Sequence, residues 1–347
     1  MRIFDYSFLE NGMLPAKLLS ITNMISEMKT AGLQRKEQHP NIFTSLESIA
    51  KVQSVKSSNA IEGIVTSEER IAEIVSKSSA PLNHDEMEIA GYRDALNAIH
   101  EGYATMDVRE SDILGLHRLM LSHTPEGGGL YKGSDNVIME IDALGRRKVR
   151  FEPTPASETQ ETMEQMIFAY VDARSNSSIN SLLLIPCFIL DFLCIHPFSD
   201  GNGRMSRLLS LLLMYKNGYD AGKYISYEEQ INNAKGLYYE ALRLSSSGWH
   251  DSTNSYFPFI ENFLLMLLQC YRELDKRFAI VQGKRITKKQ RVEATVLNSL
   301  LPISKVEISY FLPDVSPTTI EAVLASMVKN GAIKKIGEAR NTKYIKS

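Results

Sequence analysis

A polar, glycine-rich stretch stands between two of the most apolar segments of the sequence. It runs from His196 to Arg207 and reads HPFSDGNGRMSR, after LLLIPCFILDFLCI and before LLSLLLM. Both neighbours have the length and composition of buried helices. Polar groups placed between buried helices cost free energy unless each finds a partner. A fold that gathers them there is expected to use them.

The residue types of this stretch suit a phosphate-binding turn. Gly201, Asn202 and Gly203 open the second helix, where unpaired backbone N–H groups and the positive end of the helix dipole attract an anion. Arg204 and Arg207 are three residues apart, so one helix face presents two guanidinium groups. The spacing therefore predicts contacts with successive phosphates.

Two further side chains suit phosphoryl chemistry. Asp200 offers the oxygen ligand that Mg²⁺ prefers. His196 titrates near neutral pH and could accept a proton from an incoming hydroxyl. A lone histidine at a helix end is more often structural, and a lone GNG is more often a turn. The prediction therefore depends on the whole set of residues.

The stretch resembles, position for position, the HPFx[D/E]GNGRxxR signature of Fic proteins (Fic/Doc superfamily), which transfer AMP from ATP to a protein hydroxyl. The resemblance implies that His196 is the base and that Asp200 holds Mg²⁺. It also implies that the GNG turn holds phosphates and that Arg207 binds the γ-phosphate. For Arg204 two roles stay open, a further phosphate contact or a structural one.

A second motif lies at the end of another predicted helix. The helical pattern starts at Thr44, with Thr44 or Ser45 as N-cap, and should stop near Glu62 and Gly63. Glu62 then places a negative charge at the negative end of its helix dipole. Ser58 is one turn earlier, so its hydroxyl could steer that carboxylate. On spacing alone, an ordinary solvated glutamate is the favoured interpretation.

The family resemblance favours a different interpretation of Glu62. Residues 58–63 read SNAIEG and match the [S/T]xxxE[G/N] inhibitory motif of many Fic proteins. Their position is similar to that of the class whose inhibitory helix precedes the core. The resemblance implies that Glu62, with Ser58, pairs with Arg207 and blocks productive placement of the γ-phosphate.

Helices and one hairpin are expected around these motifs. Residues 66–124 predict two or three helices, and later helices are expected at 158–173, 180–195, 204–215 and 257–268. Residues 131–151 predict a β-hairpin with strands at 136–141 and 148–151 around a turn at 142–145. It could be an ordinary surface hairpin, but its position matches the Fic flap, which holds a segment of the target protein.

A helix predicted at 232–243 carries the candidate nucleobase contacts. The rings of Tyr238 and Tyr239 could stack on a purine, although for each ring taken singly core packing is slightly favoured. The family has an INxxxxxYY-like segment near the adenine. This sequence keeps Ile231, Asn232 and both tyrosines but has Ala234 where a polar residue is expected.

The tail resembles a winged helix-turn-helix, with helices predicted at 291–300, 304–311 and 316–330 and a hairpin at 333–345. Residues 283–347 hold twelve Lys or Arg and five Asp or Glu, whereas the whole chain has a net charge of −2. The predicted wing carries Lys334, Lys335, Arg340, Lys343 and Lys346. DNA binding and a protein-binding or dimerising role both stay open.

Composition constrains the compartment. The three cysteines, Cys187, Cys194 and Cys270, lie in apolar helical runs without paired spacing, which indicates buried thiols in a reducing compartment. The longest apolar run is interrupted by Pro186 and Asp191 and is shorter than the roughly 20 residues that span a bilayer. The N-terminus lacks a signal-peptide pattern. We expect a cytoplasmic protein without membrane contact.

The histidines outside the motif lack metal-binding spacing, so we expect them to be surface or hydrogen-bonded core residues. They include His84, His100, His117 and His123.

The sequence thus predicts a mainly α protein in three parts. Residues 1–100 form an N-terminal helical segment with the inhibitory motif, 101–275 a Fic catalytic core with a β-hairpin flap, and 284–347 a winged helix. The implied activity is Mg²⁺-dependent transfer of AMP from ATP to a Ser, Thr or Tyr hydroxyl of a target protein or of the chain itself. Another Fic-type transfer, removal of AMP, and a nucleotide-sensing regulator are the alternatives. Homodimer formation stays open.

Overall fold

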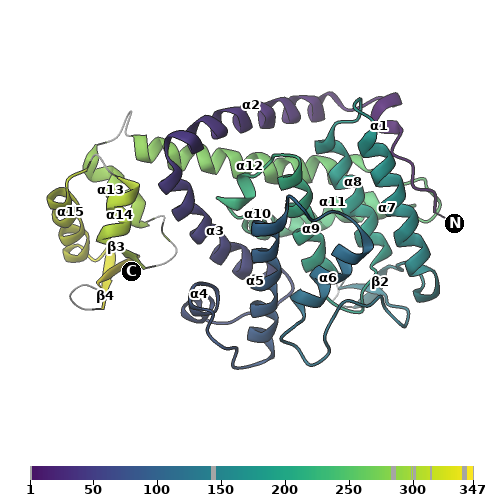
Figure 1. Cartoon of the computed structure of the whole chain (residues 1–347), viewed down its shortest axis with the longest axis horizontal. Coiled ribbons are helices and arrows are strands. Elements are labelled where there is room, and N and C mark those ends of the chain that lie inside the picture. Colours follow the sequence, from purple (N-terminus) through teal and green to yellow (C-terminus); the bar gives the residue numbers. More distant parts are fainter. Residues whose placement is uncertain are drawn as a thin grey trace.

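The computed structural model describes residues 2–141, 146–282, 287–297, 299, 302–312, 315–337 and 342–346. These residues form a mainly helical protein with two small antiparallel sheets, which confirms the predicted fold class (Figure 1). No helix in this part of the chain is both long and apolar enough to cross a membrane.

The helices that precede the hairpin are α1 (Phe8–Asn11), α2 (Ala16–Gln38), α3 (Pro40–Ile61), α4 (Glu68–Lys77), α5 (His84–Gly102) and α6 (Glu110–Met120). The hairpin strands are β1 (Ile138–Ile141) and β2 (Arg147–Phe151). The helices that follow are α7 (Thr159–Ser175), α8 (Ser181–Ile195), α9 (Asn202–Lys216), α10 (Tyr227–Asn233), α11 (Lys235–Ser246) and α12 (Phe257–Gln282). The tail contains α13 (Lys288–Leu297), β3 (Ile303–Ser304), α14 (Lys305–Phe311), α15 (Pro317–Lys329), β4 (Ile333–Ile336) and β5 (Lys343–Lys346).

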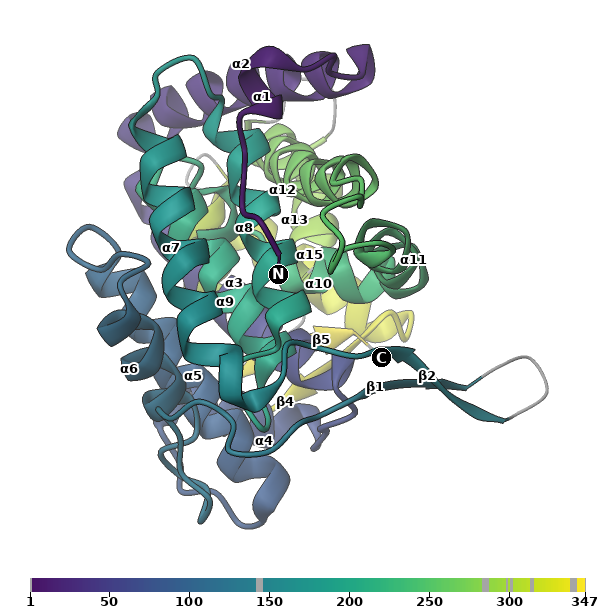
Figure 2. The same ribbon diagram turned by 90° about the vertical axis from the view of Figure 1, so that its right-hand side faces the viewer.

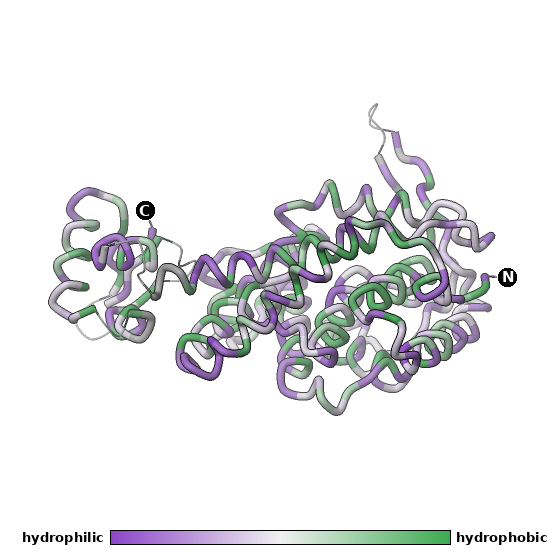
Figure 3. The backbone as a smooth tube through the Cα atoms, turned by 90° about the horizontal axis from the view of Figure 1, so that it is seen from above, coloured by the Kyte–Doolittle hydropathy of each residue, from purple (hydrophilic) through white to green (hydrophobic). Residues whose placement is uncertain are grey.

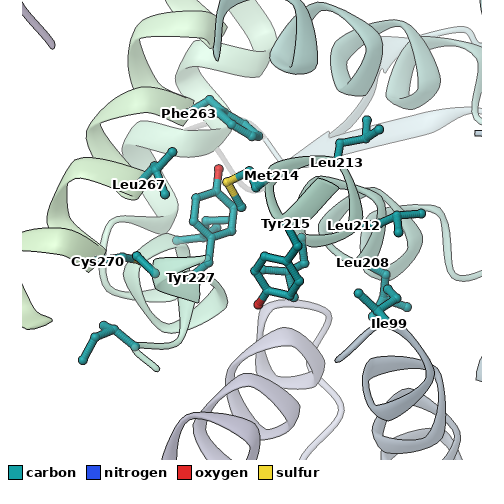
Figure 4. Close-up of a cluster of buried hydrophobic side chains, with 14 of the residues drawn as sticks. Ile99, Leu208, Leu212, Leu213, Met214, Tyr215, Tyr227, Phe263, Leu267 and Cys270 are labelled. Atoms are coloured by element: carbon teal, nitrogen blue, oxygen red, sulfur yellow. The ribbon is translucent and has the colours of Figure 1, made fainter. Parts of the chain in front are cut away.

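Helices α8 and α9 form the centre of the core. Every residue of α8 from Leu182 to Ile195 is buried, and so is the apolar face of α9. Side chains from α9, α10 and α12 pack together beside them (Figure 4). Along the tube of Figure 3, apolar segments face the interior of the helical body and polar segments its outside. The turn between α8 and α9 is therefore held at both ends by buried helices.

Asp191 is a charged residue inside this apolar centre. Its carboxylate accepts hydrogen bonds from the hydroxyl of Tyr6 at 2.8 Å and from Nε1 of Trp249 at 2.6 Å. Tyr256 donates at 2.9 Å, and Arg2 forms an ion pair at 3.4 Å. Burial raises the pKa of Asp191 although these partners oppose the shift. The cluster ties the N-terminal segment to α8.

The bounds of helix α2 were not predicted, although residues 1–100 were expected to form a helical segment. Only Leu18, Ile21, Thr22 and Ile25 of its 23 residues are buried, all in its first half, so the second half has no apolar periodicity to detect. The helix packs along α12 (Figure 1).

The start of α3 was also placed too late. It begins at Pro40 rather than after a cap at Thr44, because proline fits the first helical position, where no N–H bond is lost. Its end is as predicted. Ile61 is the last helical residue, Glu62 is the C-cap, and Gly63 has φ +85°.

Most other elements confirm the expectation, including the three helices within residues 66–124 and the antiparallel pairing of β1 with β2. The paired strands project from the helical body (Figure 2). The predicted turn at 142–145 lies outside the described residues. The single helix predicted at 232–243 is two helices, because the chain leaves helical geometry at Ala234. The three cysteines are buried and free, as predicted.

The tail has the predicted helices and hairpin, with a three-stranded sheet of order β3-β5-β4. Ser304 and Glu307 form a capping box at α14, and Ser316 caps α15 ahead of Pro317. The tail contacts the core through α12 and through α14, which lies against α3 (Figure 1). Arg340 of the predicted wing lies outside the described residues.

Candidate functional site

The turn between α8 and α9 is shaped by Asn202 and two left-handed residues. His196 ends α8 at φ +53°, and Gly201 precedes α9 at φ +79°. The Phe198 N–H donates to Oδ1 of Asn202 at 2.9 Å, and Nδ2 of Asn202 donates to the Phe198 carbonyl at 2.7 Å. The side chain of Asn202, predicted to contact nucleotide, is thus occupied in closing the turn.

Lys132 supports the same turn from outside the motif, which the sequence did not reveal. Its Nζ donates to the Ile195 carbonyl at 3.2 Å and to Oδ1 of Asn136 at 2.9 Å. Its backbone N–H donates to the Pro197 carbonyl at 2.9 Å. Burial lowers the pKa of Lys132 to about 8. No motif marks this lysine, because its partners in the turn lie more than 60 residues away in the sequence.

His117 is a hydrogen-bonded core histidine, as expected, and it also positions the motif. The Gly129 N–H donates to Nδ1 at 2.9 Å, so Nε2 carries the proton and donates to the Asp200 carbonyl at 3.1 Å. The ring stacks on Phe198 with centroids 3.7 Å apart. Burial lowers the pKa of His117 to about 4, which keeps the ring neutral at neutral pH.

His196 has the protonation state that a base requires. Its Nδ1 lies 3.3 Å from the Leu193 carbonyl, which can only accept, so Nδ1 carries the proton and Nε2 has a free lone pair. Burial lowers the pKa of His196 to about 4. The ring lines a cavity beside the motif. A neutral imidazole at this place can accept a proton at neutral pH.

Arg207 joins the two predicted motifs. Its Nη2 lies 2.9 Å from Oε1 of Glu62, and its side chain is only 2% exposed. Nε donates to Oγ of Ser58 at 2.8 Å, and Nη2 donates to the Ser58 carbonyl at 2.9 Å. The structure therefore brings these three residues together. The Ser58 hydroxyl bonds the arginine instead of steering Glu62, so that detail of the spacing argument is wrong.

The Glu62 carboxylate also lies against the N-terminus of α9. A Cβ atom added at Gly203 would overlap Oε1 of Glu62, so a larger residue here would require the carboxylate to move. At the end of α3 the Glu62 carboxylate is repelled by the negative end of its own helix dipole. Its contacts with the positive end of α9 and with the Arg207 guanidinium offset that repulsion. It occupies the place that the motif offers to an anion.

Lys235 holds the end of the Glu62 helix. Its Nζ donates to the Ile61 carbonyl at 2.6 Å, where the last turn of α3 leaves carbonyls unpaired. Sequence reasoning missed this residue, since the contact joins segments 174 residues apart.

A cavity of about 550 Å³ opens between the motif, the hairpin and α11. It is lined by Glu62, Ile138, Met139, Glu140, Arg150, Leu193, His196, Gly203, Arg207, Gly236, Tyr238, Tyr239, Glu240, Leu242 and Arg243. The Tyr238 and Tyr239 rings meet edge to face with centroids 5.6 Å apart. Asn232, at the end of α10, does not line this cavity, so the structure does not place it with the other predicted contacts.

Arg204 makes structural contacts, which is one of the two roles left open for it. Its buried guanidinium pairs with Glu88 and lies 2.9 Å from Oδ2 of Asp200. The Asp200 side chain is 71% exposed. Within the described ranges no three His, Cys, Asp or Glu side chains are grouped to hold a metal ion. A single exposed carboxylate still fits Mg²⁺, which commonly takes its other ligands from phosphates and water.

Fold and site together define a class, a helical protein whose central turn combines a neutral histidine with an anion-binding helix end. Residues 107–214 match the Fic/DOC family. Residues 107–214 thus form a domain of the Fic/DOC family. The matched range lies within the predicted core, while the outer domain boundaries stay a prediction.

Most of the curated relatives found are named Fic. A protein adenylyltransferase Fic from Nematostella vectensis is 27% identical over 205 residues, covering 53% of this chain and 44% of the relative. One from Drosophila yakuba is 28% identical over 145 residues, covering 41% of this chain and 26% of the relative. A Fido domain-containing protein from Dictyostelium discoideum is 29% identical over 86 residues, covering 25% of this chain and 58% of that protein. The chain thus spans about half or less of the length of most of them.

Solved structures share the fold. A Fic family protein from Desulfovibrio desulfuricans superposes with a TM-score of 0.62 at 20% identity, covering 96% of this chain and 97% of that one. A Fic domain containing signaling protein from Bacteroides thetaiotaomicron gives 0.59 at 18% identity, covering 74% and 94%. The first likeness extends over both the core and the tail.

Proposed function

We propose that this chain is a protein adenylyltransferase that moves AMP from ATP to a protein hydroxyl. One observation carries the proposal. Neutral His196 and the anion site formed by Gly203 and Arg207 line the same cavity. A base and a phosphate-binding site that face one cavity suit phosphoryl-type transfer, which needs mainly positioning and charge stabilisation.

In the proposed reaction, a Ser, Thr or Tyr hydroxyl of the target gives its proton to Nε2 of His196. The hydroxyl oxygen then bonds to the α-phosphorus of ATP, and the bond between that phosphorus and the β-phosphate oxygen breaks. AMP remains on the target and pyrophosphate leaves. Arg207 and the N–H groups of Gly203 and its neighbours hold the phosphates. Mg²⁺ bound by Asp200 would neutralise charge on the phosphates.

The Glu62 contact supports inhibition of this reaction from within the chain. While its carboxylate is paired with Arg207, that guanidinium cannot bind a γ-phosphate. The ATP molecule then lacks the contact that would align its α-phosphorus. Ser58 and Lys235 hold the two sides of the contact in place.

The hairpin is proposed to bind the target protein. Strand β1 lines the cavity with Ile138, Met139 and Glu140, and β1 and β2 form a sheet of only two strands. An open strand edge can pair with an extended target segment through backbone hydrogen bonds. The paired segment would present its hydroxyl to His196 with little demand on sequence.

Isotope position in ATP distinguishes this reaction from its alternatives. The chain, with Glu62 replaced by Gly, is incubated with ATP labelled at either the α- or the γ-phosphorus, and the protein products are analysed by mass. AMP transfer places only the α label on protein, and the same assay detects self-modification. Labelling from the γ position would identify phosphorylation, and an added UMP in a parallel incubation with UTP would identify UMP transfer. Loss of AMP from a modified protein would identify the reverse activity.

A further inference from the structure

A second cavity lies between α3, α10 and α12, beside α13. Its volume is about 830 Å³, and it shares no lining residue with the cavity at the motif. Gln53 of α3 and Leu297 of α13 stand at its edges, so core and tail both contribute. Ligand sites commonly have this size and often lie where two parts of a protein meet.

Arg277 is the unusual residue of this cavity. It is half-buried on α12, and among the described residues it has neither a hydrogen bond nor an ion pair within 4 Å. Burial lowers its pKa, although Glu229 and Glu273 oppose the shift from a distance. A partly buried cation without a direct partner costs free energy, so a fold that keeps one is expected to offer it to a ligand.

The other charges of the cavity leave an excess of positive charge. Lys276 lies 2.6 Å from Glu273, so these two charges neutralise each other. Arg272 is exposed and, within the described ranges, lacks an ion-pair partner. Glu229 is the remaining carboxylate of the lining, so the two guanidinium groups face one negative charge.

Polar and apolar groups accompany the two arginines. Nε2 of Gln53 donates to Glu229 at 3.3 Å, while its buried Oε1 has no hydrogen-bond partner among the described residues. Leu265, Met266 and Leu297 supply apolar lining. An acidic group would meet the arginines, and a carbon skeleton would lie on the apolar side.

We propose that this cavity is a second ligand site for a small organic anion, a carboxylate or phosphate monoester with an apolar body. Its acidic group pairs with Arg277 and Arg272, and its body lies against Leu265, Met266 and Leu297. The site is separate from the proposed transfer reaction, and its test does not depend on activity.

Calorimetric titration of the full chain tests the site with two probes, phenyl phosphate and benzoate. The chains compared are the native one, Arg277→Gln, Arg207→Ala, and Arg118→Gln as a control that removes one exposed cation elsewhere. We expect binding to the native, Arg207→Ala and Arg118→Gln chains. In Arg277→Gln the affinity should fall roughly ten- to a hundredfold, as for a lost charge-assisted hydrogen bond. The probe that binds more tightly shows whether the site prefers a phosphate or a carboxylate group.

Two results would overturn the proposal. One is binding that Arg207→Ala abolishes and Arg277→Gln leaves intact, since the probe would then occupy only the motif. The other is no binding of either probe to the native chain. Thermal unfolding without ligand gives an independent check. Arg277→Gln should leave the melting temperature unchanged or raise it, because it removes an unpaired charge. A clear decrease would make Arg277 a structural cation and contradict the site.

Discussion

His117 and His196 show how one residue type serves two purposes within a few ångströms of the same turn. Burial keeps both rings neutral. His117 uses both nitrogens, one toward Gly129 and one toward Asp200, so it can only hold the turn in place. His196 uses one nitrogen toward Leu193, and its other nitrogen has no hydrogen-bond partner in the part of the chain that the structure describes. The hydrogen-bond partners, not the residue type, decide which histidine is the proposed base.

Replacing the proposed base should abolish AMP transfer without weakening ATP binding. We expect His196→Ala to lower the rate of AMP transfer by about 10²–10⁴-fold while ATP affinity changes little, because the imidazole acts on the target hydroxyl. Labelled ATP measures the rate, and calorimetry the affinity. His123→Ala, which removes a histidine paired with Asp94, is the control. Transfer at the native rate in His196→Ala would disprove the assigned role.

The buried His117 should make stability depend on pH. Its pKa is about 4 in the folded chain and about 6.5 when unfolded, so between these values the unfolded state binds more protons. The unfolding free energy should therefore rise with pH in this window, by at most about 1.4 kcal/mol per unit from this group. His117→Gln should reduce that slope in urea titrations at several pH values. The raised pKa values of Asp191 and Glu229 make the unfolding free energy fall as pH rises, but they do so equally in the native and His117→Gln chains. Equal slopes in the two proteins would contradict this explanation.

At the scale of elements, the sequence predicts best what local patterns determine. The turn before α9 and the stop of α3 at Gly63 follow from glycine and capping preferences within a few residues. The bounds of helix α2 were not predicted because its second half contains no fully buried residue. Lys132 and Lys235 were not predicted as site residues, because each donates a hydrogen bond to a backbone carbonyl that is distant in sequence. Such contacts leave no local pattern.

The contact between α3 and α9 can be tested at Gly203. A methyl group there overlaps the Glu62 carboxylate, so Gly203→Ala should destabilise the native chain by about 1–3 kcal/mol despite the higher helix propensity of alanine. In a Glu62→Gly background the cost should largely disappear, since the obstructing carboxylate is gone. Urea denaturation of the four chains gives the coupling energy. Equal costs in both backgrounds would show that the carboxylate does not occupy this place in solution.

At the scale of the whole molecule, the proposed chemistry and the tail are separate in sequence but not in space. Every residue assigned to the reaction precedes α13, whereas α14 lies against the helix that carries Ser58. Figure 1 shows the tail at one end of the long axis, at the end of α12. Lys334, Lys335 and Lys343 of the tail hairpin are exposed, as a surface for nucleic acid or an acidic protein would require.

Removing residues 284–347 should leave self-modification intact, because the proposed active site lies upstream. Any retention on DNA should be lost with the tail, and in the full chain it should weaken steeply with salt. Gel-shift assays at several salt concentrations and labelled-ATP assays measure the two effects. A shortened chain that fails to fold would show instead that α13 and α14 complete the core.

The central claim, that Glu62 inhibits the chain by holding Arg207, is tested most directly by the initial rate of AMP transfer across ATP concentrations. Four variants are compared with the native chain: Glu62→Gly, Arg207→Ala, the two combined, and Glu37→Gly. The last is a control that removes an exposed glutamate from the end of α2. Glu62→Gly should transfer AMP faster than the native chain by an order of magnitude or more, since the freed guanidinium can bind the γ-phosphate. Arg207→Ala should be inactive alone and in combination, and Glu37→Gly should match the native chain. A Glu62→Gly chain no faster than the native one at any ATP concentration would contradict the account.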